Sequence, residues 1–172
     1  TAGTWATNQS VIQPMAPGVR RTGDVVKIRH AATGATASGT NVVAIDTSIP
    51  QQTGETNLFM SLAITPASSI NRLFIESYGQ LSQSANAATV AALFQDSTEN
   101  ALKTSFASPS GAGLSIGFSV IHEMAAGTVS ETTFKYGAML NSAGTTYFNS
   151  SGGTNNLGGT LMSYMRITEI FT

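Results

Sequence analysis

Residues Ala125–Phe171 read AAGTVSETTFKYGAMLNSAGTTYFNSSGGTNNLGGTLMSYMRITEIF. Three short strand-like runs lie in this segment between turns rich in Gly, Ser, Thr and Asn, and the segment closes on the run Ile167–Ile170. Its four charged residues are Glu131, Lys135, Arg166 and Glu169. A segment that favours strands, carries few charges and is rich in small hydroxyl groups is typical of a structural or binding module rather than an enzyme.

The alternation of apolar and polar residues extends upstream to Asp24, and a period of two is the mark of half-buried strands. The expected strands are Val25–His30, Asn41–Asp46, Leu58–Ile64, Leu73–Leu81, Ala87–Gln95, Ile116–Met124, Glu131–Leu140, Thr145–Asn149 and Leu161–Phe171. Thr33–Gly39 is expected as a turn, and Ala87–Gln95 fits either a strand or one helical turn. No stretch shows a 3.6-residue period with caps at both ends. The sequence therefore predicts an all-β chain, an antiparallel β-sandwich of the jelly-roll kind.

Several of these strands are apolar on both faces. The opposed pairs are Phe59 and Met60, Phe74 and Leu73, and Ile121 and Val120. One face of each strand fills the core of the sandwich, and the other needs a second cover. A neighbouring subunit is the simplest cover, so we expect a homotrimer, held by the burial of this second apolar face.

The composition places the chain among compact globular proteins with unusually few charges. Its 172 residues fit one domain with a sizeable core, and 41% of them are hydrophobic. Only 10% are charged, whereas Thr and Ser together supply 43 residues, a quarter of the chain. Polarity therefore comes mostly from neutral hydroxyl groups, which cost less to bury at a subunit face than charges do.

The same numbers exclude several classes of partner and site. The net charge is −1 and the pI is near 6.0, so nothing indicates a nucleic-acid partner. The absence of Cys excludes disulfides and thiolate metal sites. No apolar run is long enough to span a membrane, and no signal peptide is visible. Four cations lie close together at Arg20, Arg21, Lys27 and Arg29, and we interpret them as a solvated hinge rather than a phosphate clamp.

Residues 1–22 differ from the rest of the chain and are expected to form an extended docking arm. They carry Pro, Thr, Asn and Gln, have no charge before Arg20, and include isolated apolar anchors at Trp5, Ile12 and Met15. Such anchors stabilise only when they enter a partner's pocket. We therefore predict an arm that docks on another protein and a single β-sandwich domain over residues 23–172. Because residue 1 is Thr and not Met, we expect that the chain is processed or is a piece of something longer.

The sequence gives little evidence for a catalytic site. Gly113–Gly117 matches the G-x-S-x-G nucleophile elbow, but a strand pattern follows it where the elbow needs a helix. His122 and Glu123 are adjacent on an expected strand and so point to opposite faces. We interpret His122 as a histidine at an interface or at the edge of the core, and the alternative is that a trimer brings three copies of it together as a metal or pH site. The carboxylates are scattered, and Asp96 and Glu99 lie where a turn alone explains them. We expect no enzyme, no cofactor and no metal site.

An ordered series of short motifs runs through the chain. Its members are Ser48–Gln51, Thr53–Glu55, Leu62–Pro66, Asn71–Glu76, Val90–Asp96, Asn100–Leu102, Ala126–Thr128, Thr132–Phe134, Ala143–Thr145, Phe148–Asn149, Gly158–Gly159 and Ile167–Ile170. The series resembles the C-terminal module of tail-fibre, tailspike and related virion surface proteins of tailed bacteriophages, and it covers about three quarters of the chain. The resemblance implies an all-β fold, homotrimeric assembly and a place on the virion, and it implies no catalytic residues.

Three functions remain in competition. The first is a tail-fibre or spike module that attaches to the host, the second is a head fibre or capsid decoration protein, and the third is a polysaccharide depolymerase. For attachment we expect the loops Gln80–Ala88 and Tyr147–Asn156 to contact host glycan, because small polar groups hydrogen-bond sugar hydroxyls and Tyr stacks on sugar rings. The candidate contact residues are Tyr147, Asn149, Asn155, Asn156 and Asn86. The alternative interpretation is that these loops are ordinary solvated turns.

Overall fold

A computed structural model gives the fold of this chain, and it describes residues 19–172. The proposed anchors Trp5, Ile12 and Met15 lie outside the described residues. Strand accounts for 52% of the structure, and its one helical element within the described range is the three-residue 3-10 turn Leu157–Gly159. The strands are β1 (Val25–Thr33), β2 (Ala37–Gly39), β3 (Asn57–Ile64), β4 (Arg72–Gln83), β5 (Thr89–Gln95), β6 (Lys103–Ala107), β7 (Ser115–Ala125), β8 (Thr132–Leu140), β9 (Thr146–Phe148) and β10 (Ser163–Ile170).

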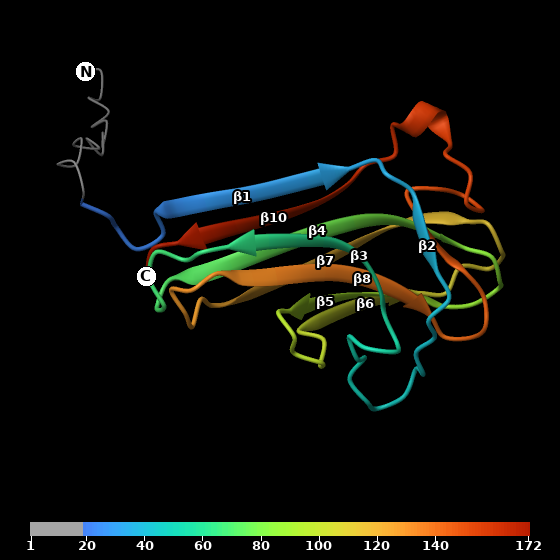
Figure 1. Ribbon diagram of the computed structural model, residues 1–172, viewed down its shortest axis with the longest axis horizontal. Helices are drawn as coiled ribbons and strands as arrows, with labels where there is room; N and C mark the ends of the chain where they lie inside the picture. The colour runs from blue at the N-terminus through green and yellow to red at the C-terminus, as the bar shows by residue number, and fades with distance from the viewer. Residues whose placement is uncertain (1–18) are drawn as a thin grey trace, which may run out of the picture.

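The strands form two antiparallel sheets that lie face to face (Figure 1). Sheet A has the order β1-β10-β4-β7, and the short strands β2 and β9 continue β1 and β10 at one end. Sheet B has the order β3-β8-β5-β6. If only the eight long strands are numbered along the chain, the sheets read 1-8-3-6 and 2-7-4-5. This order is that of a jelly roll, a double Greek key, so the predicted fold class is confirmed.

The main core fills the space between the sheets, and period-two alternation explains which side chains enter it. On β4 the inward residues Leu73, Ile75 and Leu81 are fully buried, and the same holds on β8 for Phe134 and Tyr136. These faces are the ones that the sequence predicts. At the start of β3, a bulge shifts the register between Leu58 and Met60, so Leu58 faces solvent instead of joining Met60 in the core as expected.

The segment 41–56 differs from the sequence prediction. The expected strand Asn41–Asp46 is wrong, because this stretch makes one isolated bridge, from Val42 to Leu140, and otherwise runs as a loop. The loop crosses the outer face of sheet B and buries Val43 there (Figure 1). Residues 89–94 of β5 are consequently buried on both faces. For β5 the second cover is therefore a segment of the same chain.

Polar side chains pin this segment to the turn between β5 and β6. The Gln52 side chain donates to the carbonyls of Asp96 and Thr98 and accepts a 2.7 Å hydrogen bond from Lys135. The Glu99 carboxylate accepts from the backbone N–H and the hydroxyl of Thr53. Asp96 has a φ of 51° and accepts from Thr132 and Thr133, so both carboxylates have the turn-holding role expected for them.

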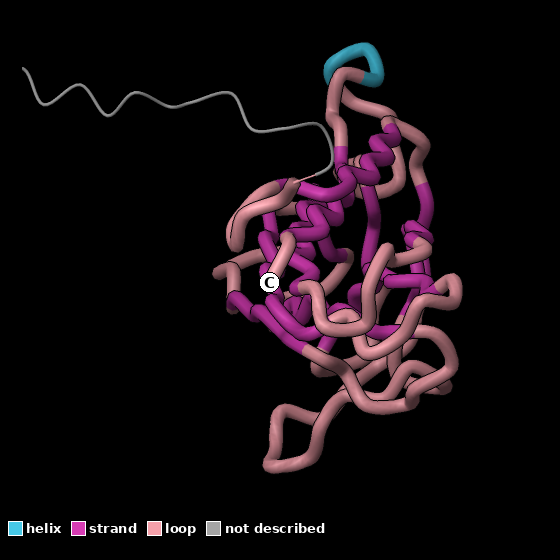
Figure 2. Tube along the Cα trace, turned by 90° about the vertical axis from the view of Figure 1, so that its left-hand side faces the viewer, coloured by secondary structure: helices cyan, strands magenta, loops and turns pink. Residues whose placement is uncertain are grey.

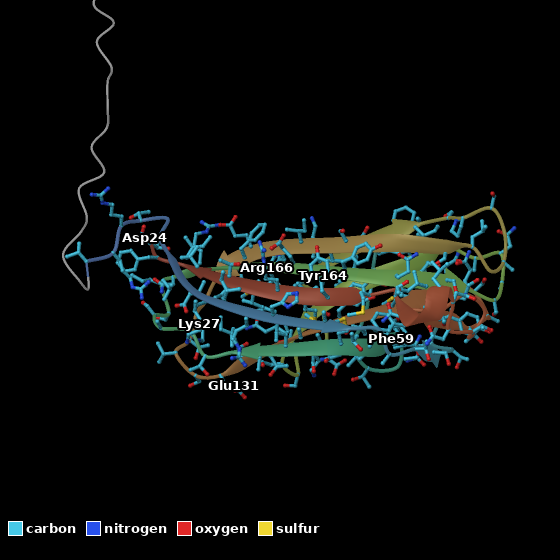
Figure 3. All side chains as sticks on the ribbon, turned by 90° about the horizontal axis from the view of Figure 1, so that it is seen from above. Asp24, Lys27, Phe59, Glu131, Tyr164 and Arg166 are labelled. Carbon is cyan, nitrogen blue, oxygen red and sulfur yellow. The ribbon has the colours of Figure 1, made fainter. Side chains whose placement is uncertain are left out.

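Over most of its length, the outer face of sheet A stays uncovered by the described residues. Phe74 is half-buried there and Ile121 is 49% exposed, beside the ion pairs Arg72–Glu123 and Arg166–Glu76. Tyr164 and Arg166 lie near one another on this face (Figure 3). The ring of Tyr164 stacks between those of His30 and Tyr78, with centroid separations of 6.1 and 5.8 Å.

The basic group near the N-terminus donates hydrogen bonds to backbone carbonyls. Lys27 and Arg29 extend from β1 to the carbonyls of Thr65 and Ala63, on the edge of β3. Arg20 donates to the carbonyl of Val25. These contacts occupy the free edge of β3 with cations, which is how natural sheets discourage pairing with a further chain. Regular pairing of the chain begins at Gly23, whose N–H donates to the carbonyl of Phe171.

Candidate binding loops

A loop of fourteen residues, 149–162, leaves sheet A between β9 and β10. Along β4, β9 pairs with Leu81–Gln83 and β10 pairs with residues up to Tyr78, so both follow the same edge of β4. The loop 149–162 therefore interrupts what would otherwise be one continuous strand beside β4. The 3-10 turn within the loop stands away from both sheets (Figure 2).

Asn149 lies at the base of this loop, and its side chain holds the loop to the sandwich by hydrogen bonds. Its side-chain amide donates to the carbonyls of Thr33 and Ala35, at 2.9 and 3.1 Å, and accepts a 2.6 Å hydrogen bond from the hydroxyl of Ser163. It adopts a φ of 52°, a left-handed conformation that Asn tolerates better than most residues. Asn149 is fully buried. Its prediction as an exposed contact residue is therefore wrong, because its polar groups hold the loop to β1 and β10.

The first half of the loop folds over the outer face of sheet A. The carbonyl of Ser150 accepts from the hydroxyl of Ser82, and the hydroxyl of Ser151 donates to the carbonyl of Gly113. Tyr147 lies half-buried on β9, and one edge of its ring packs against Gly153. A Cβ at Gly153 would come within 3.3 Å of that ring. Tyr147 thus offers only part of its ring to a ligand.

The tip of the loop carries the exposed groups. Leu157 is 74% exposed and adopts a φ of 54°, and Gly158 and Gly159 that follow it also have positive φ. A left-handed Leu costs about 1 kcal/mol, and strain of this kind gathers at functional sites. Asn155 is exposed, with its amide close to Gly159. Sequence reasoning missed Leu157, although a lone Leu within Asn155–Gly159, NNLGG, is a visible signal.

The two loops chosen from the sequence lie at the same end of the jelly roll. Ser82 pairs with Tyr147, and beyond that pair Ser84 exchanges hydrogen bonds with Thr145 through its N–H and its hydroxyl. Asn86 is exposed on this side. Four of the five candidate contact residues are at least partly accessible: Tyr147, Asn155, Asn156 and Asn86. The fifth, Asn149, is buried.

The residues considered for catalysis lie apart. Ser115 begins β7, and His122 lies seven residues along the same strand, a separation of about 23 Å at the usual rise per residue. The Ser115 hydroxyl accepts a hydrogen bond from Gln80, and Glu123 pairs with Arg72 on the opposite face from His122. His30 lies on β1, at the other edge of sheet A. The G-x-S-x-G match therefore has neither histidine beside it.

The side chain of His122 points toward the core from β7, which is an edge strand of sheet A. Partial burial lowers the pKa of its imidazole, and the positive charge of Lys103 lowers this pKa further. Among residues 19–172, no group of three or more His, Asp or Glu side chains is placed to hold a metal ion. No helix within this range is long and apolar enough to cross a bilayer.

No protein-family model matches this chain, and no curated protein is similar to it in sequence. Several solved structures are distantly similar in shape. The VP2 subviral particle protein of infectious bursal disease virus has 14% identity and a TM-score of 0.38, over 93% of this chain and 42% of that protein. The sugar-binding C-terminal domain of EclA has 11% identity and a TM-score of 0.34, over 97% and 88%.

A third similar structure is the pilus protein of Bacillus endospore appendages, with 11% identity and a TM-score of 0.33, over 92% of this chain and 100% of that protein. This chain spans about two fifths of the VP2 protein that it matches. The fold assignment rests on the strand order itself.

Proposed function

We propose that this chain is a surface module of a bacteriophage virion, in a tail fibre or spike, and that it attaches to the host through the loop end of its jelly roll. The motif series from Ser48 to Ile170 supports the viral assignment. The observation that carries the attachment role is the loop 149–162, which is hydrogen-bonded at its base by Asn149 and stands clear of both sheets at its tip.

The chemistry of the tip suits a neutral glycan. Residues 149–162 contain no charged side chain and present amides, hydroxyls and the apolar side chain of Leu157. A saccharide offers the same mixture, with hydroxyl groups around an apolar ring face. Neutral donors and acceptors bind such a surface with a smaller desolvation cost than ionised groups would incur. Because Asn149 holds the base of the loop, the loop loses little conformational entropy when it binds a ligand.

Competition for host cells tests the proposal. Purified chain should reduce adsorption of the phage that encodes it, and the double variant Asn155→Ala/Leu157→Ser should lose most of this competition. The matched control is Val129→Ser, an equally simple change at a residue that is 59% exposed in the loop between β7 and β8, at the opposite end of the sandwich. Equal competition by the loop variant and the wild type would sink the assignment of the loop end.

We further propose that attachment involves no catalysis. Incubation of the purified chain with host surface polysaccharide should leave the polymer at its starting length, and released oligosaccharide would favour the depolymerase alternative. A chain that fails to compete with phage, yet is found on the capsid shell, would instead support the capsid decoration role.

The docking role of residues 1–22 stays a prediction. Removal of residues 1–18 should abolish incorporation into virions while the β-domain, whose pairing begins at Gly23, still folds. Normal incorporation of the shortened chain would contradict the docking role.

A further inference from the structure

The outer edge of β7 is the longest free strand edge among residues 19–172. In sheet A, β7 lies at the end of the order β1-β10-β4-β7 and pairs with β4 alone. All eleven residues of β7 pair with β4 in one register, without a bulge. The far side of β7 is therefore a straight row of backbone groups that no described residue covers.

The hydrogen bonds of the ladder show which backbone groups point outward. The N–H of Ala126 donates to the carbonyl of Asn71, and this bond extends the β4–β7 register by one pair. In an antiparallel ladder, bonded pairs alternate with unbonded pairs. The even-numbered residues of β7 therefore bond to β4, and the odd-numbered ones, from Ser115 to Glu123, direct their N–H and C=O groups away from it. None of these outward groups has a partner within residues 19–172.

The other long edges carry features that discourage the addition of a strand. Lys27 and Arg29 donate to carbonyls on the edge of β3. β1 has a bulge between Val25 and Lys27, and β6 is only five residues long. Natural sheets protect their edges by cations, bulges and short strands of this kind. β7 is long and regular and contains no Pro, Lys or Arg, so its edge is open to a further strand.

The first thirteen residues of the chain have the composition of such a strand. Residues 1–13 contain neither a charge nor Pro, and six of them are Thr, Trp, Val or Ile, which favour strands. Pro14 and Pro17 follow, and Pro lacks the N–H that a ladder needs. The stretch before Pro14 is long enough to pair with the eleven residues of β7.

We propose that residues 1–13 of one copy add to the free edge of β7 in another copy as an antiparallel strand. The proposal rests on the docking role of residues 1–22 and names the partner for that role. Main-chain hydrogen bonds supply the affinity in strand addition, so an uncharged segment is sufficient. Contacts of this head-to-tail kind close into rings, and three of them suffice for the expected homotrimer.

The place where residues 1–13 join the domain favours β7 of another copy over β7 of the same chain. Val25 and Ala125 lie at the same end of sheet A, because β1, β10, β4 and β7 alternate in direction. Val19 lines a hollow with Val25 at this end (Figure 1). The six links from residue 13 to Val19 span at most about 22 Å. β7 is about 36 Å long at the usual rise per residue.

Within one chain, residue 13 therefore does not reach the Ser115 end of β7. It reaches only the Ala125 end, and from there residues 1–13 would run parallel to β7. All eight pairs of named strands in this fold are antiparallel. A neighbouring copy can be placed so that the added strand is antiparallel as well.

Molecular mass in solution gives the first test. The purified full chain at micromolar concentration should show the mass of two or more chains by light scattering, and Ser119→Pro should reduce it to the 17.8 kDa of one chain. Ser119 is exposed, and its N–H points to the free edge. Pro at such a position removes no bond to β4, so the far-UV circular dichroism should stay unchanged.

The matched control is Ala32→Pro on β1, the opposite edge strand of sheet A. The same alternation, carried across β4 and β10, directs the N–H of Ala32 to the free edge of β1. Ala32 is also exposed. This variant should keep the wild-type mass, because the change is the same and only the edge differs.

Cross-linking gives a second test that needs no loss of assembly. The chain has no Cys, so introduced thiols are the only ones present. Thr7 lies at the middle of residues 1–13, and Ser119 lies near the middle of β7. With a short thiol cross-linker, the double variant Thr7→Cys/Ser119→Cys should form covalent multimers linked between these two positions. The control Thr7→Cys/Ala32→Cys should not.

A monomeric wild type, or an assembly that Ser119→Pro leaves intact, would overturn the proposal. A cross-link from position 7 to position 119 within one chain would also overturn it, because residues 1–13 would then lie on their own β7. Its failure is distinguishable from that of the docking role. If Ser119→Pro stays assembled but the chain without residues 1–18 fails to enter virions, the docking role stands with another partner. If Ser119→Pro is monomeric and the shortened chain still enters virions, only the contact between copies stands.

Discussion

Tyr136 of β8 crosses the interior of the sandwich and lies against Gly79 of β4, where its ring takes the space that a side chain would need. A Cβ built on Gly79 would overlap the Cε1 and Oη atoms of Tyr136. Both residues are buried, and the φ of Gly79 is not positive, so packing and not backbone conformation requires the glycine. The pair joins the two sheets near the middle of the core.

Gly79→Ala should therefore destabilise the domain. The added methyl group forces the ring or one of the sheets to move, and overpacking of this kind costs about 1–3 kcal/mol. Chemical denaturation measures the loss. Gly111→Ala is the control, because the nearest atom to its Cβ would be Leu114 Cδ1 at 3.8 Å, and its stability should match the wild type. Equal stability of both variants would show that the ring yields at no cost.

Tyr136→Phe should leave stability unchanged or raise it. The Tyr136 hydroxyl is buried without a hydrogen-bond partner among the described residues, and burial, with a smaller effect of Tyr78, raises the pKa of this phenol. Removal of an unpaired buried polar group loses no bond. The contrasting variant is Tyr78→Phe, which gives up the 2.7 Å hydrogen bond to Gln80 and should cost about 1 kcal/mol. In thermal melts, Tyr78→Phe should lower the Tm, whereas Tyr136→Phe should not; a lower Tm for Tyr136→Phe would contradict the prediction.

Glu169 should matter far more than its place near the end of the chain suggests. It is fully buried, and its Oε1 accepts from the backbone of Ala67 at 2.8 Å and from the Asn71 side chain at 2.6 Å, which ties the β3–β4 connection to β10. Glu169→Ala leaves those donors unpaired and should cost about 3 kcal/mol.

Glu169→Gln keeps an acceptor at the same place and should cost less than Glu169→Ala. The exposed Glu131→Ala serves as the control. Urea titrations in which Glu169→Ala unfolds at the same midpoint as Glu131→Ala would contradict the anchoring role of Glu169.

Where apolar and polar residues alternate cleanly, the sequence alone predicts which face of a strand enters the core. The inward faces of β4, β7 and β8 match their predicted periodicity, because each strand has one face on the core. The alternation misleads at Asn41–Asp46, where the apolar residues are those of a loop that covers sheet B. Covering a sheet and pairing within one both bury apolar side chains, so composition alone does not separate them. Lys103–Ala107, which forms β6, shows no clear alternation in the sequence and is not among the predicted strands.

The candidate loops are turns, as their composition predicts, but Asn149 lies in the interior and not at the surface. Asn, Ser and Gly mark turns in any sequence, and two such turns proved to lie side by side. The interior role of Asn149 depends on Thr33 and Ser163, which are distant in sequence, so no local pattern could reveal it. Leu157 was overlooked because one apolar residue in a polar loop has no periodicity.

Acidification should destabilise the domain in part through His122. Its folded-state pKa lies below 6.5, so the unfolded chain binds the proton more readily than the folded chain does. The free energy of unfolding should therefore be highest above pH 6.5, fall as the pH drops through 6.5, and level off below the folded-state pKa. His122→Gln should show a smaller fall across this window. Parallel curves for the two proteins in urea titrations between pH 8 and pH 5 would argue against it.

The anchor of the loop 149–162 can be separated into two contributions by a pair of substitutions at Asn149. Asn149→Gly keeps the left-handed φ of 52° and removes the amide that bonds to Thr33, Ala35 and Ser163, whereas Asn149→Ala removes the amide and also strains the backbone. Each lost hydrogen bond contributes about 1 kcal/mol, and the strain adds about 1 kcal/mol.

Stability should thus fall in the order wild type, Asn149→Gly, Asn149→Ala. Both variants should be cut faster by a nonspecific protease within residues 151–161, because the base that holds the loop has opened. The exposed Asn86→Ala, on the neighbouring loop, should be cut at the wild-type rate. If the Asn149 variants also lose competition with phage while their circular dichroism stays intact, the anchor is needed to present the tip. Unchanged cleavage of both variants would mean that the loop holds its shape without Asn149.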